Sequence, residues 1–208
     1  MRLLLVPTEL ELAAFPDAPD IAAARVGEAE WRDYRVALCG FGPVDAAVGA
    51  MAALARCGDV ELCVLAGLAG TLDADYCAIG DVVEAATFRL HDFETAALPV
   101  GCRGAHEPTS IEEGTVFLDL EWMQQVELLT VTSPAADAAT AAARREAFPE
   151  ARAEEMEGYS VARAARALAV PFTCLRAISN VAGEREGWDV KGAVAALAER
   201  LAEVGAGS

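Results

Sequence analysis

Apolar and polar positions divide the chain into strand-like runs that alternate with helix-like segments. Short apolar or alternating runs bounded by Gly, Pro or polar residues predict strands at residues 3–6, 34–39, 61–66, 80–88, 126–131 and 171–178. Longer, mostly alanine-rich segments predict helices at residues 44–56, 135–148, 156–169 and 189–204. This alternation predicts an α/β protein, a three-layer α/β/α sandwich around a mixed, largely parallel, twisted central sheet. Since no internal repeat or interdomain linker is visible, we expect residues 1–208 to form a single domain.

The predicted fold indicates where a binding site should lie. Residues 98–114 contain several Pro and Gly and predict a loop or lid. Ligands of open α/β sheets gather beyond the carboxyl ends of the strands. We therefore expect the site among the loops that follow Val6, Cys39, Ala66, Val131 and Ile178.

Composition and charge narrow the classes of partner. The hydrophobic fraction of 54% argues against disorder, and the formal net charge of −17 repels nucleic acids and anionic membrane surfaces. No apolar stretch approaches the roughly 18 residues of a membrane span, and no signal-peptide pattern is visible, so we expect a cytoplasmic protein. The six Cys lack the close pairs typical of zinc or redox sites and only two His are present. We expect neither a metal nor an organic cofactor.

Two pairs of carboxylates stand at places where chemistry could occur. Glu9 and Glu11 follow the first predicted strand, and in a helix their side chains diverge by about 200°, so at most one of them should face a site. Glu155 and Glu157 stand at the predicted start of a helix. A negative charge there either contacts a ligand or stabilises the helix N-terminus, and spacing leaves both interpretations open.

Glycines mark the ends of two predicted strands. Gly40 and Gly42 are typical of a tight strand-to-helix turn, but the third glycine of a dinucleotide-binding motif would fall at Asp45, which excludes that motif. Gly67 belongs to a run of small residues in which backbone can come close to another group.

The predicted strand at 171–178 carries a charge and is followed by polar residues. Because Arg is rarely buried without a partner, Arg176 indicates a nearby carboxylate or an anionic ligand. Ser179 and Asn180 come at the end of this strand, where they either cap the next turn or contact a ligand.

Taken together, these segments resemble the nucleoside phosphorylase and nucleosidase superfamily, and most closely its futalosine hydrolase branch. Residues 179–185, Ser-Asn-Val-Ala-Gly-Glu-Arg, favour that branch. The segments that carry the resemblance, in this order, are residues 6–11, 40–43, 66–70, 79–83, 155–158 and 176–180.

The resemblance implies cleavage of the bond between a purine and its ribose through an oxocarbenium-like transition state. It implies that Glu11 activates the attacking water, that Glu157 binds the ribose hydroxyls and that Met156 packs on the sugar. It further implies a homodimer and a small-molecule purine nucleoside as partner. The other residues expected to contact substrate are Glu155, Ser179, Gly42, Gly67 and Arg185.

Two departures from related sequences define the expected reaction. Asn180 stands where adenine-releasing relatives have Asp, and its amide can stabilise a leaving 6-oxopurine but cannot donate a proton as a general acid. Residues 7–11 lack the glycine-rich turn and arginine that phosphorylases place after the first strand, so water is the expected nucleophile. The resemblance therefore predicts hydrolysis of futalosine to hypoxanthine and dehypoxanthine futalosine, a reaction of menaquinone biosynthesis.

Alternatives stay open at this stage. A methylthioadenosine or adenosylhomocysteine nucleosidase, or another purine nucleosidase, is the rival enzyme, and a non-catalytic nucleoside-binding domain is the rival outside enzymes. Residues 132–135 lack the aromatic residue that stacks on the base in adenine-type relatives, so we expect Phe88 or Phe93 to replace it. The benzoate of futalosine requires a cation, for which Arg185 is the first candidate and Arg89 the second.

Overall fold

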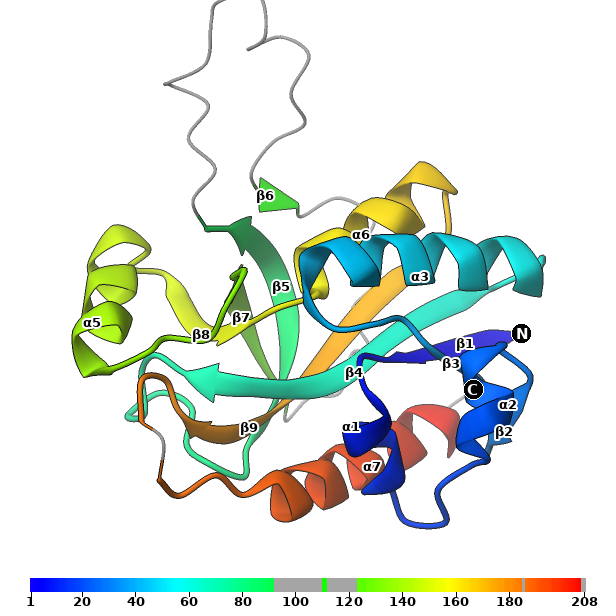
Figure 1. Ribbon diagram of the computed structural model, residues 1–208, viewed down its shortest axis with the longest axis horizontal. Coiled ribbons are helices and arrows are strands. Elements are labelled where there is room, and N and C mark those ends of the chain that lie inside the picture. Colours follow the sequence, from blue (N-terminus) through cyan, green and yellow to red (C-terminus); the bar gives the residue numbers. More distant parts are fainter. Residues whose placement is uncertain (92–109, 112–122, 185, 207–208) are drawn as a thin grey trace, which may run out of the picture.

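The computed structural model describes residues 1–91, 110–111, 123–184 and 186–206, which fold around one sheet of nine strands (Figure 1). The strands are β1 (Arg2–Val6), β2 (Ala29–Trp31), β3 (Tyr34–Leu38), β4 (Leu62–Thr71), β5 (Val82–Leu90), β6 (Ser110–Ile111), β7 (Gln124–Thr130), β8 (Ala151–Glu155) and β9 (Phe172–Val181). The helices are α1 (Glu9–Ala13), α2 (Ile21–Arg25), α3 (Gly42–Cys57), α5 (Ala138–Ala147), α6 (Gly158–Ala167) and α7 (Val190–Ala206).

The sheet is mixed and partly closes on itself. Parallel pairs join β3 to β1, β1 to β4, β4 to β9, β5 to β7 and β7 to β8. Antiparallel pairs join β2 to β3, β4 to β8, β5 to β6 and β5 to β9. Because β4, β9, β5, β7 and β8 each pair with the next and β8 returns to β4, these strands form a ring. The expected mixed sheet is confirmed, whereas its closure was not foreseen.

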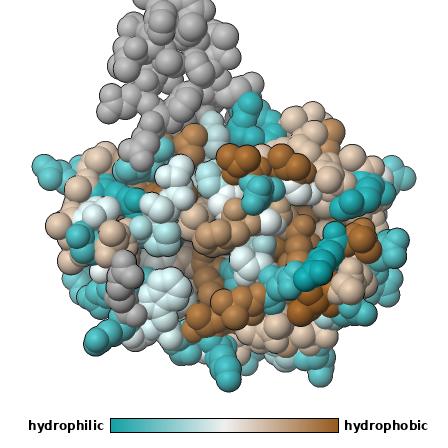
Figure 2. Space-filling view, viewed as in Figure 1, coloured by the Kyte–Doolittle hydropathy of each residue, from teal (hydrophilic) through white to brown (hydrophobic). Residues whose placement is uncertain are grey.

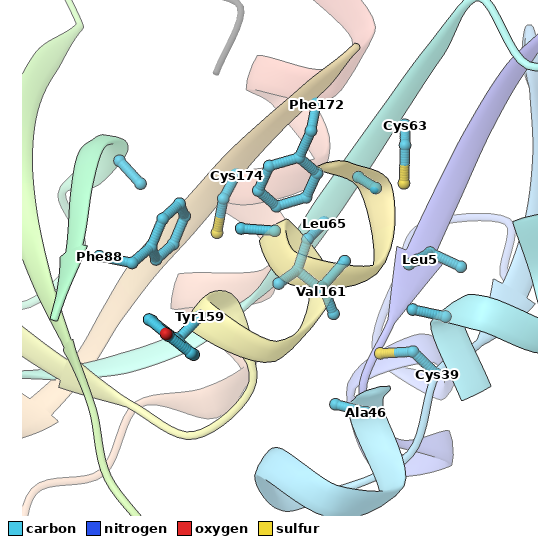
Figure 3. Packing of buried hydrophobic residues seen from close by; sticks show 14 of the residues in the cluster. Leu5, Cys39, Ala46, Cys63, Leu65, Phe88, Tyr159, Val161, Phe172 and Cys174 are labelled. Atoms are coloured by element: carbon cyan, nitrogen blue, oxygen red, sulfur yellow. The ribbon is translucent and has the colours of Figure 1, made fainter. Parts of the chain in front are cut away.

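Helices cover both faces of the sheet, which confirms the layered architecture (Figure 1). Helices α3 and α6 lie on one face, and α1, α2 and α7 lie on the other. The core under α3 and α6 joins small residues such as Ala46 and Cys39 to larger ones such as Leu65 and Phe88 (Figure 3). Small side chains let the helices approach the strands closely, which is how an alanine-rich chain fills its core.

The sequence prediction was wrong at the start of α6. Residues 151–155 form β8, and the helix begins at Gly158 rather than at residue 156. The β8 sequence, Ala-Arg-Ala-Glu-Glu, contains residue types that are depleted in strands, so it carries no strand signal of its own. Its pairing with β7 and β4 decides its conformation. The short elements α1, α2, β2 and β6 were also not predicted, and residues 98–114 lie almost wholly outside the described residues.

Gly49 generates a prediction about the packing of α3. A Cβ at this position would lie 2.0 Å from the carbonyl oxygen of Cys39, just after β3. Ala normally stabilises a helix interior by about 1 kcal/mol relative to Gly. Here we expect Gly49→Ala to lower the free energy of unfolding by about 2 kcal/mol or more, because the helix must move off the sheet. Urea denaturation measures the change.

Val48 offers the control for this substitution. It neighbours Gly49 on the same helix but is 66% exposed. We expect Val48→Ala to change the free energy of unfolding by no more than about 0.5 kcal/mol. A Gly49→Ala variant as stable as the wild type would contradict the close packing of α3 on β3.

Candidate active site

A cavity of about 340 Å³ lies where residues near the carboxyl ends of β1, β4, β8 and β9 meet those that follow β7. Its position agrees with the expected end of the sheet, but the lining residues after Ala66 and Ile178 lie inside β4 and β9 rather than in loops, because both strands extend further than the sequence predicted. Apolar residues gather across the middle of the molecular face shown in Figure 2. The polar lining residues are Thr8, Glu11, Glu154, Glu155, Glu157, Ser179 and Asn180, and the apolar ones include Leu10, Phe41, Leu68, Pro134, Met156, Trp188 and Val190.

A second and larger cavity, of about 520 Å³, lies between α5 and the ends of β4 and β9. Alanines make up much of its lining, together with a few exposed charged residues such as Arg145 and Glu146. None of the buried carboxylates around Arg176 lines this second cavity. The smaller cavity is therefore the candidate site.

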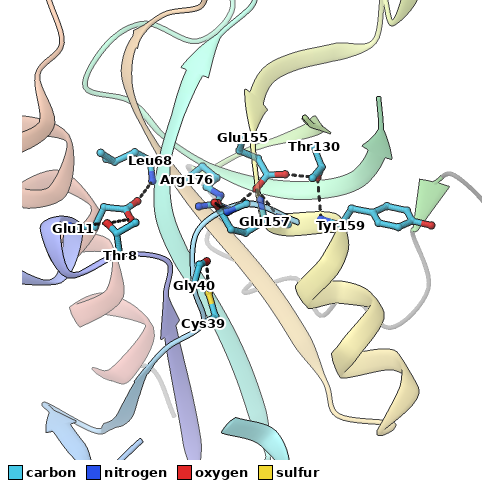
Figure 4. Close-up of polar contacts among 12 residues, drawn as sticks. Thr8, Glu11, Cys39, Gly40, Leu68, Thr130, Glu155, Glu157, Tyr159 and Arg176 are labelled. Carbon is cyan, nitrogen blue, oxygen red and sulfur yellow. Dashed lines mark hydrogen bonds and ion pairs between the residues drawn. The ribbon is translucent and has the colours of Figure 1, made fainter. Parts of the chain in front are cut away.

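The Glu11 side chain is held in place at the wall of the cavity. Thr8 caps α1 by accepting the N–H of Glu11, and its hydroxyl donates to Glu11 Oε2 at 2.6 Å. The N–H of Leu68 donates to Glu11 Oε1 at 3.0 Å (Figure 4). Glu9, by contrast, is exposed and paired with Arg25. Only Glu11 of the two lines the cavity, in agreement with the expectation that at most one of them faces a site.

Sequence reasoning missed Thr8, although a signal was present. Thr8 followed three residues later by Glu11 is the pattern of a capping box. In the structure the Thr8 hydroxyl turns to the carboxylate of Glu11, so the motif that begins α1 also fixes the acidic side chain. The Phe41 and Trp188 side chains at the cavity were missed as well, because nothing in their local sequence indicates a site.

The buried guanidinium of Arg176 joins two carboxylates. Arg176 Nη2 donates to Glu157 Oε2 at 3.1 Å and to Glu155 Oε2 at a shorter distance, and its side chain has no exposed surface (Figure 4). Of the two partners that the sequence left open, carboxylate or anionic ligand, the structure provides carboxylates. A guanidinium buried this deeply requires such partners.

The Glu155 side chain binds the backbone where β8 passes into α6. Its side chain accepts the N–H groups of Glu157 at 2.9 Å and Gly158 at 2.6 Å, and the hydroxyl of Thr130. These bonds satisfy N–H groups at the beginning of α6, where a negative charge is favourable. Glu155 therefore fixes the turn from β8 into α6, and the side chain that remains for a ligand at this turn is that of Glu157.

Glu157 is a carboxylate with an unusual proton affinity. Burial raises the pKa of Glu157 from 4.5 to about 7; the charge of Arg176 lowers it, and the neighbouring Glu155 raises it further. Two carboxylates thus share one guanidinium. The Gly42 N–H donates to Glu157 Oε1 at 2.9 Å and favours the ionised form.

Of the two glycines expected to contact substrate, Gly67 makes room for these side chains and Gly42 binds one of them through its backbone N–H. Gly67 lies opposite Arg176 in the β4–β9 register, and a Cβ there would lie 2.2 Å from Arg176 Nη1 and 3.0 Å from Glu11 Oε1. Gly42 has a φ of +79°, and its N–H holds Glu157. Neither glycine is among the residues that line the cavity.

Asn180 and Ser179 lie on the β9 side of the cavity. The Ser179 hydroxyl donates to Asn180 Oδ1 at 2.9 Å, and Asn180 Nδ2 donates to the Val181 carbonyl at 3.0 Å. These contacts fix the orientation of the amide. Met156, half-buried between the two glutamates, contributes its side chain to the same cavity.

Two other expected residues, Phe88 and Arg89, do not reach the cavity. Phe88 is fully buried and packs 5.9 Å from Phe172 between ring centroids, so it cannot stack on a ligand in this cavity. The Arg89 side chain is paired with Glu127 at 3.0 Å. Phe93 and Arg185 lie outside the described residues.

A model of the Phosphorylase superfamily matches residues 8–207. The chain belongs to the Phosphorylase superfamily. Curated relatives divide between two kinds of nucleosidase. The chain is 39% identical to the futalosine hydrolase of Streptomyces coelicolor over 49% of this chain and 39% of that protein. It is 33% identical to the futalosine hydrolase of Acidothermus cellulolyticus over 70% of this chain and 65% of that protein.

Two further relatives carry a different name. The chain is 27% identical to the 5′-methylthioadenosine/S-adenosylhomocysteine nucleosidase of Glaesserella parasuis over 92% of this chain and 87% of that protein. Among solved structures, the nucleosidase of the same name from Campylobacter jejuni has a TM-score of 0.75 and 26% identity, over 98% of this chain and 95% of that one. This Phosphorylase superfamily member therefore matches less than two thirds of the length of the futalosine hydrolases. Among its described helices, none is both long and apolar enough to cross a membrane.

The raised pKa of Glu157 predicts a pH-dependent stability in this superfamily member. Between pH 4.5 and about 7 the folded protein keeps a proton on Glu157 that the unfolded chain releases. The free energy of unfolding should therefore fall as pH rises through this range, by about 3 kcal/mol from this group. In Glu157→Gln this contribution is absent. Urea denaturation at pH 5 and pH 8 measures the difference.

Glu150→Gln provides the matched control, because Glu150 is exposed. We expect this variant to retain the wild-type dependence of stability on pH. If Glu157→Gln lost as much stability as the wild type between pH 5 and pH 8, the assignment of the raised pKa to Glu157 would be wrong.

Proposed function

We propose that the protein is a purine nucleosidase that hydrolyses the N-ribosidic bond of a 6-oxopurine nucleoside, and that its substrate is futalosine. The observation that carries this proposal is the convergence of Glu11, Glu157 and Asn180 on one cavity. Relatives named futalosine hydrolase support the substrate, and the products would be hypoxanthine and dehypoxanthine futalosine. The expected homodimer and cytoplasmic location stay predictions.

Glu11 would act as the general base. The Thr8 hydroxyl and the Leu68 N–H hold its two oxygens in place, so one carboxylate is oriented and ready to accept a proton from water. Arg176 Nη1 has no hydrogen-bond partner within the described part of the chain. Nη1 and Glu11 Oε1 both flank Gly67, but Arg176 is fully buried and does not line the cavity, so Glu11 is the one of the two that can meet the attacking water.

Glu157 would bind the ribose. Sugar hydroxyls donate to an ionised carboxylate in charge-assisted bonds, and a negative charge beside the sugar stabilises the positive charge that develops in the transition state. Arg176 and Gly42 hold Glu157 at the cavity wall, and Met156 packs beside it as an apolar surface for the sugar.

Asn180 would select the base. Its amide nitrogen can donate to N7 or to the 6-oxo group, and so stabilise the negative charge on a leaving hypoxanthine. An amide cannot transfer a proton as a carboxylic acid does, which disfavours a reaction that requires protonation of adenine at N7. The hydrogen bond from Ser179 fixes the amide in one orientation.

The charge of the cavity favours water over phosphate. Its lining, as far as the described residues go, contains glutamates and no Lys or Arg. Arg176 is already paired with two carboxylates. A phosphate dianion would meet repulsion there without a free cation, whereas water carries no charge.

A methylthioadenosine or adenosylhomocysteine nucleosidase is the second candidate. The relative with that name aligns with 92% of this chain, more than either futalosine hydrolase does. The described lining also provides no cation for the benzoate of futalosine, and Arg185, the first candidate for this role, lies outside the described residues. A non-catalytic nucleoside-binding domain would not require the fixed Glu11.

Base release distinguishes these candidates. The protein is incubated with futalosine, inosine and methylthioadenosine, with and without phosphate, and the released base is identified by chromatography. We expect hypoxanthine from futalosine at the highest rate, independent of phosphate. In Asn180→Asp the ratio of kcat/KM for methylthioadenosine to that for futalosine should rise by about 100-fold, because a carboxylic acid can protonate adenine. Faster adenine release by the wild type would support the second candidate instead.

Glu11→Gln tests the general base. Gln preserves the shape but cannot accept a proton from water, so we expect kcat to fall by about 1,000-fold with the thermal unfolding temperature little changed. Glu9→Gln is the matched control: the same substitution two residues away, on an exposed side chain, should leave kcat within about twofold. Equal kcat values for the two variants would exclude Glu11 from the chemistry.

A further inference from the structure

A second buried ion pair lies beside the cavity and takes no part in the chemistry described above. Arg144 Nη1 of α5 donates to Glu154 Oε2 of β8 at 2.5 Å, and the two side chains are only 8% and 5% exposed. Glu154 lines the cavity. Removing two charges from water is costly, so a buried pair of this kind is stable only when further hydrogen bonds satisfy both partners.

Those further bonds go to the loop between β7 and α5. Arg144 Nη2 donates to the Ser133 carbonyl at 3.0 Å, and the Ala135 N–H donates to Glu154 Oε1 at 2.7 Å. The residue between these two contacts is Pro134, which has no N–H and lines the cavity. The ion pair therefore holds the loop on both sides of Pro134.

The far end of the same loop is also fixed. Asp137 caps α5 by accepting the Thr140 N–H at 2.8 Å. A Cβ at Gly183 would lie 2.3 Å from the Asp137 carbonyl oxygen, so the chain after β9 packs directly against the loop. With both ends held and a proline ring limiting φ, Pro134 has little freedom to move away from the cavity.

The sheet register places Glu154, which holds the loop of Pro134, near Asn180. Gly70 of β4 pairs with Glu154 on β8 and with Asn180 on β9. Glu154 and Asn180 thus belong to strands that both pair with β4 at Gly70, away from Glu11 on α1. Pro134, held through Glu154, belongs to the end of the cavity that contains the amide.

We propose that Arg144 and Glu154 are positioning residues that hold Pro134 as the wall against which the purine base packs. This inference rests on the proposed function, in which Asn180 binds the base. The proline ring offers an apolar face in place of an aromatic side chain, and residues 131–137 contain no aromatic residue. A wall that is fixed before the ligand arrives loses little conformational entropy on binding, so the pair acts on affinity rather than on bond cleavage.

The double variant Arg144→Met/Glu154→Leu tests the proposal. Replacing both members leaves no unpaired buried charge, and apolar replacements of such pairs are commonly tolerated. Three quantities are measured in the wild type and the variant: KM and kcat for futalosine and inosine, the Kd of free hypoxanthine, and hydrogen exchange of the backbone across residues 132–137.

We expect KM and the hypoxanthine Kd to rise about tenfold and kcat to change by less than about threefold. The reason is that the variant loses only the hydrogen bonds that hold the Pro134 loop and none that contact the reacting atoms. Backbone exchange across residues 132–137 should accelerate, while exchange in β1 stays unchanged. Arg144→Lys keeps a cation at the position and should restore KM to within about threefold of the wild type. Arg145→Met, on the next and exposed residue, is the matched control and should leave all three quantities unchanged.

Other outcomes would overturn the proposal. Faster exchange with unchanged KM and Kd would show that the pair holds the loop but that the loop does not contact the base. A fall in kcat at constant KM would assign the pair to the chemical step. If the wild type cleaves none of the nucleosides, the proposed function fails and the change in hypoxanthine Kd alone decides the role of the pair; a wild type that does not bind hypoxanthine either overturns both.

Discussion

The guanidinium of Arg176 is a positive charge with no exposed surface, and the site is built around its neutralisation. Glu155 and Glu157 approach it from the end of β8 and the start of α6. Gly67 leaves the space that the guanidinium occupies, since a Cβ there would overlap Nη1. Loss of one partner of such a buried pair typically costs about 3–5 kcal/mol, so these residues constrain one another strongly.

The arrangement has two carboxyl groups for one guanidinium. The oxygens of Glu155 accept hydrogen bonds from Arg176, from Thr130 and from backbone N–H groups at the beginning of α6. Glu155 is therefore a structural group. Glu157 shares the same guanidinium while burial raises its pKa to about 7. A carboxylate that is poorly neutralised in the free protein gains stability when hydroxyl donors or a developing cation come beside it, which is the property a ribose-binding group requires.

Close approach of backbone and side chains recurs throughout the molecule. Small residues let α3 lie against β3 and let Arg176 lie against β4, and the high alanine content extends this packing through the core. The net charge of the protein is negative, and the described lining of the cavity is negative as well. An uncharged nucleophile suits such a cavity better than an anionic one.

Local periodicity in the sequence determined most of the regular strands and helices, the mixed layered fold and the expectation that at most one of Glu9 and Glu11 faces a site. The choice of Glu11 came from the family resemblance. The sequence also placed Asn180 after the strand at 171–178, whereas it placed Met156 and Glu157 at the start of a helix and missed the strand β8 before them. Only the tertiary structure decided that β8 is a strand and that Phe88 belongs to the core. It also decided that Gly67 leaves space for Arg176 and that Arg144 forms an ion pair with Glu154. These outcomes depend on partners brought together by the ring of strands, and such pairings leave no periodic signal in the chain.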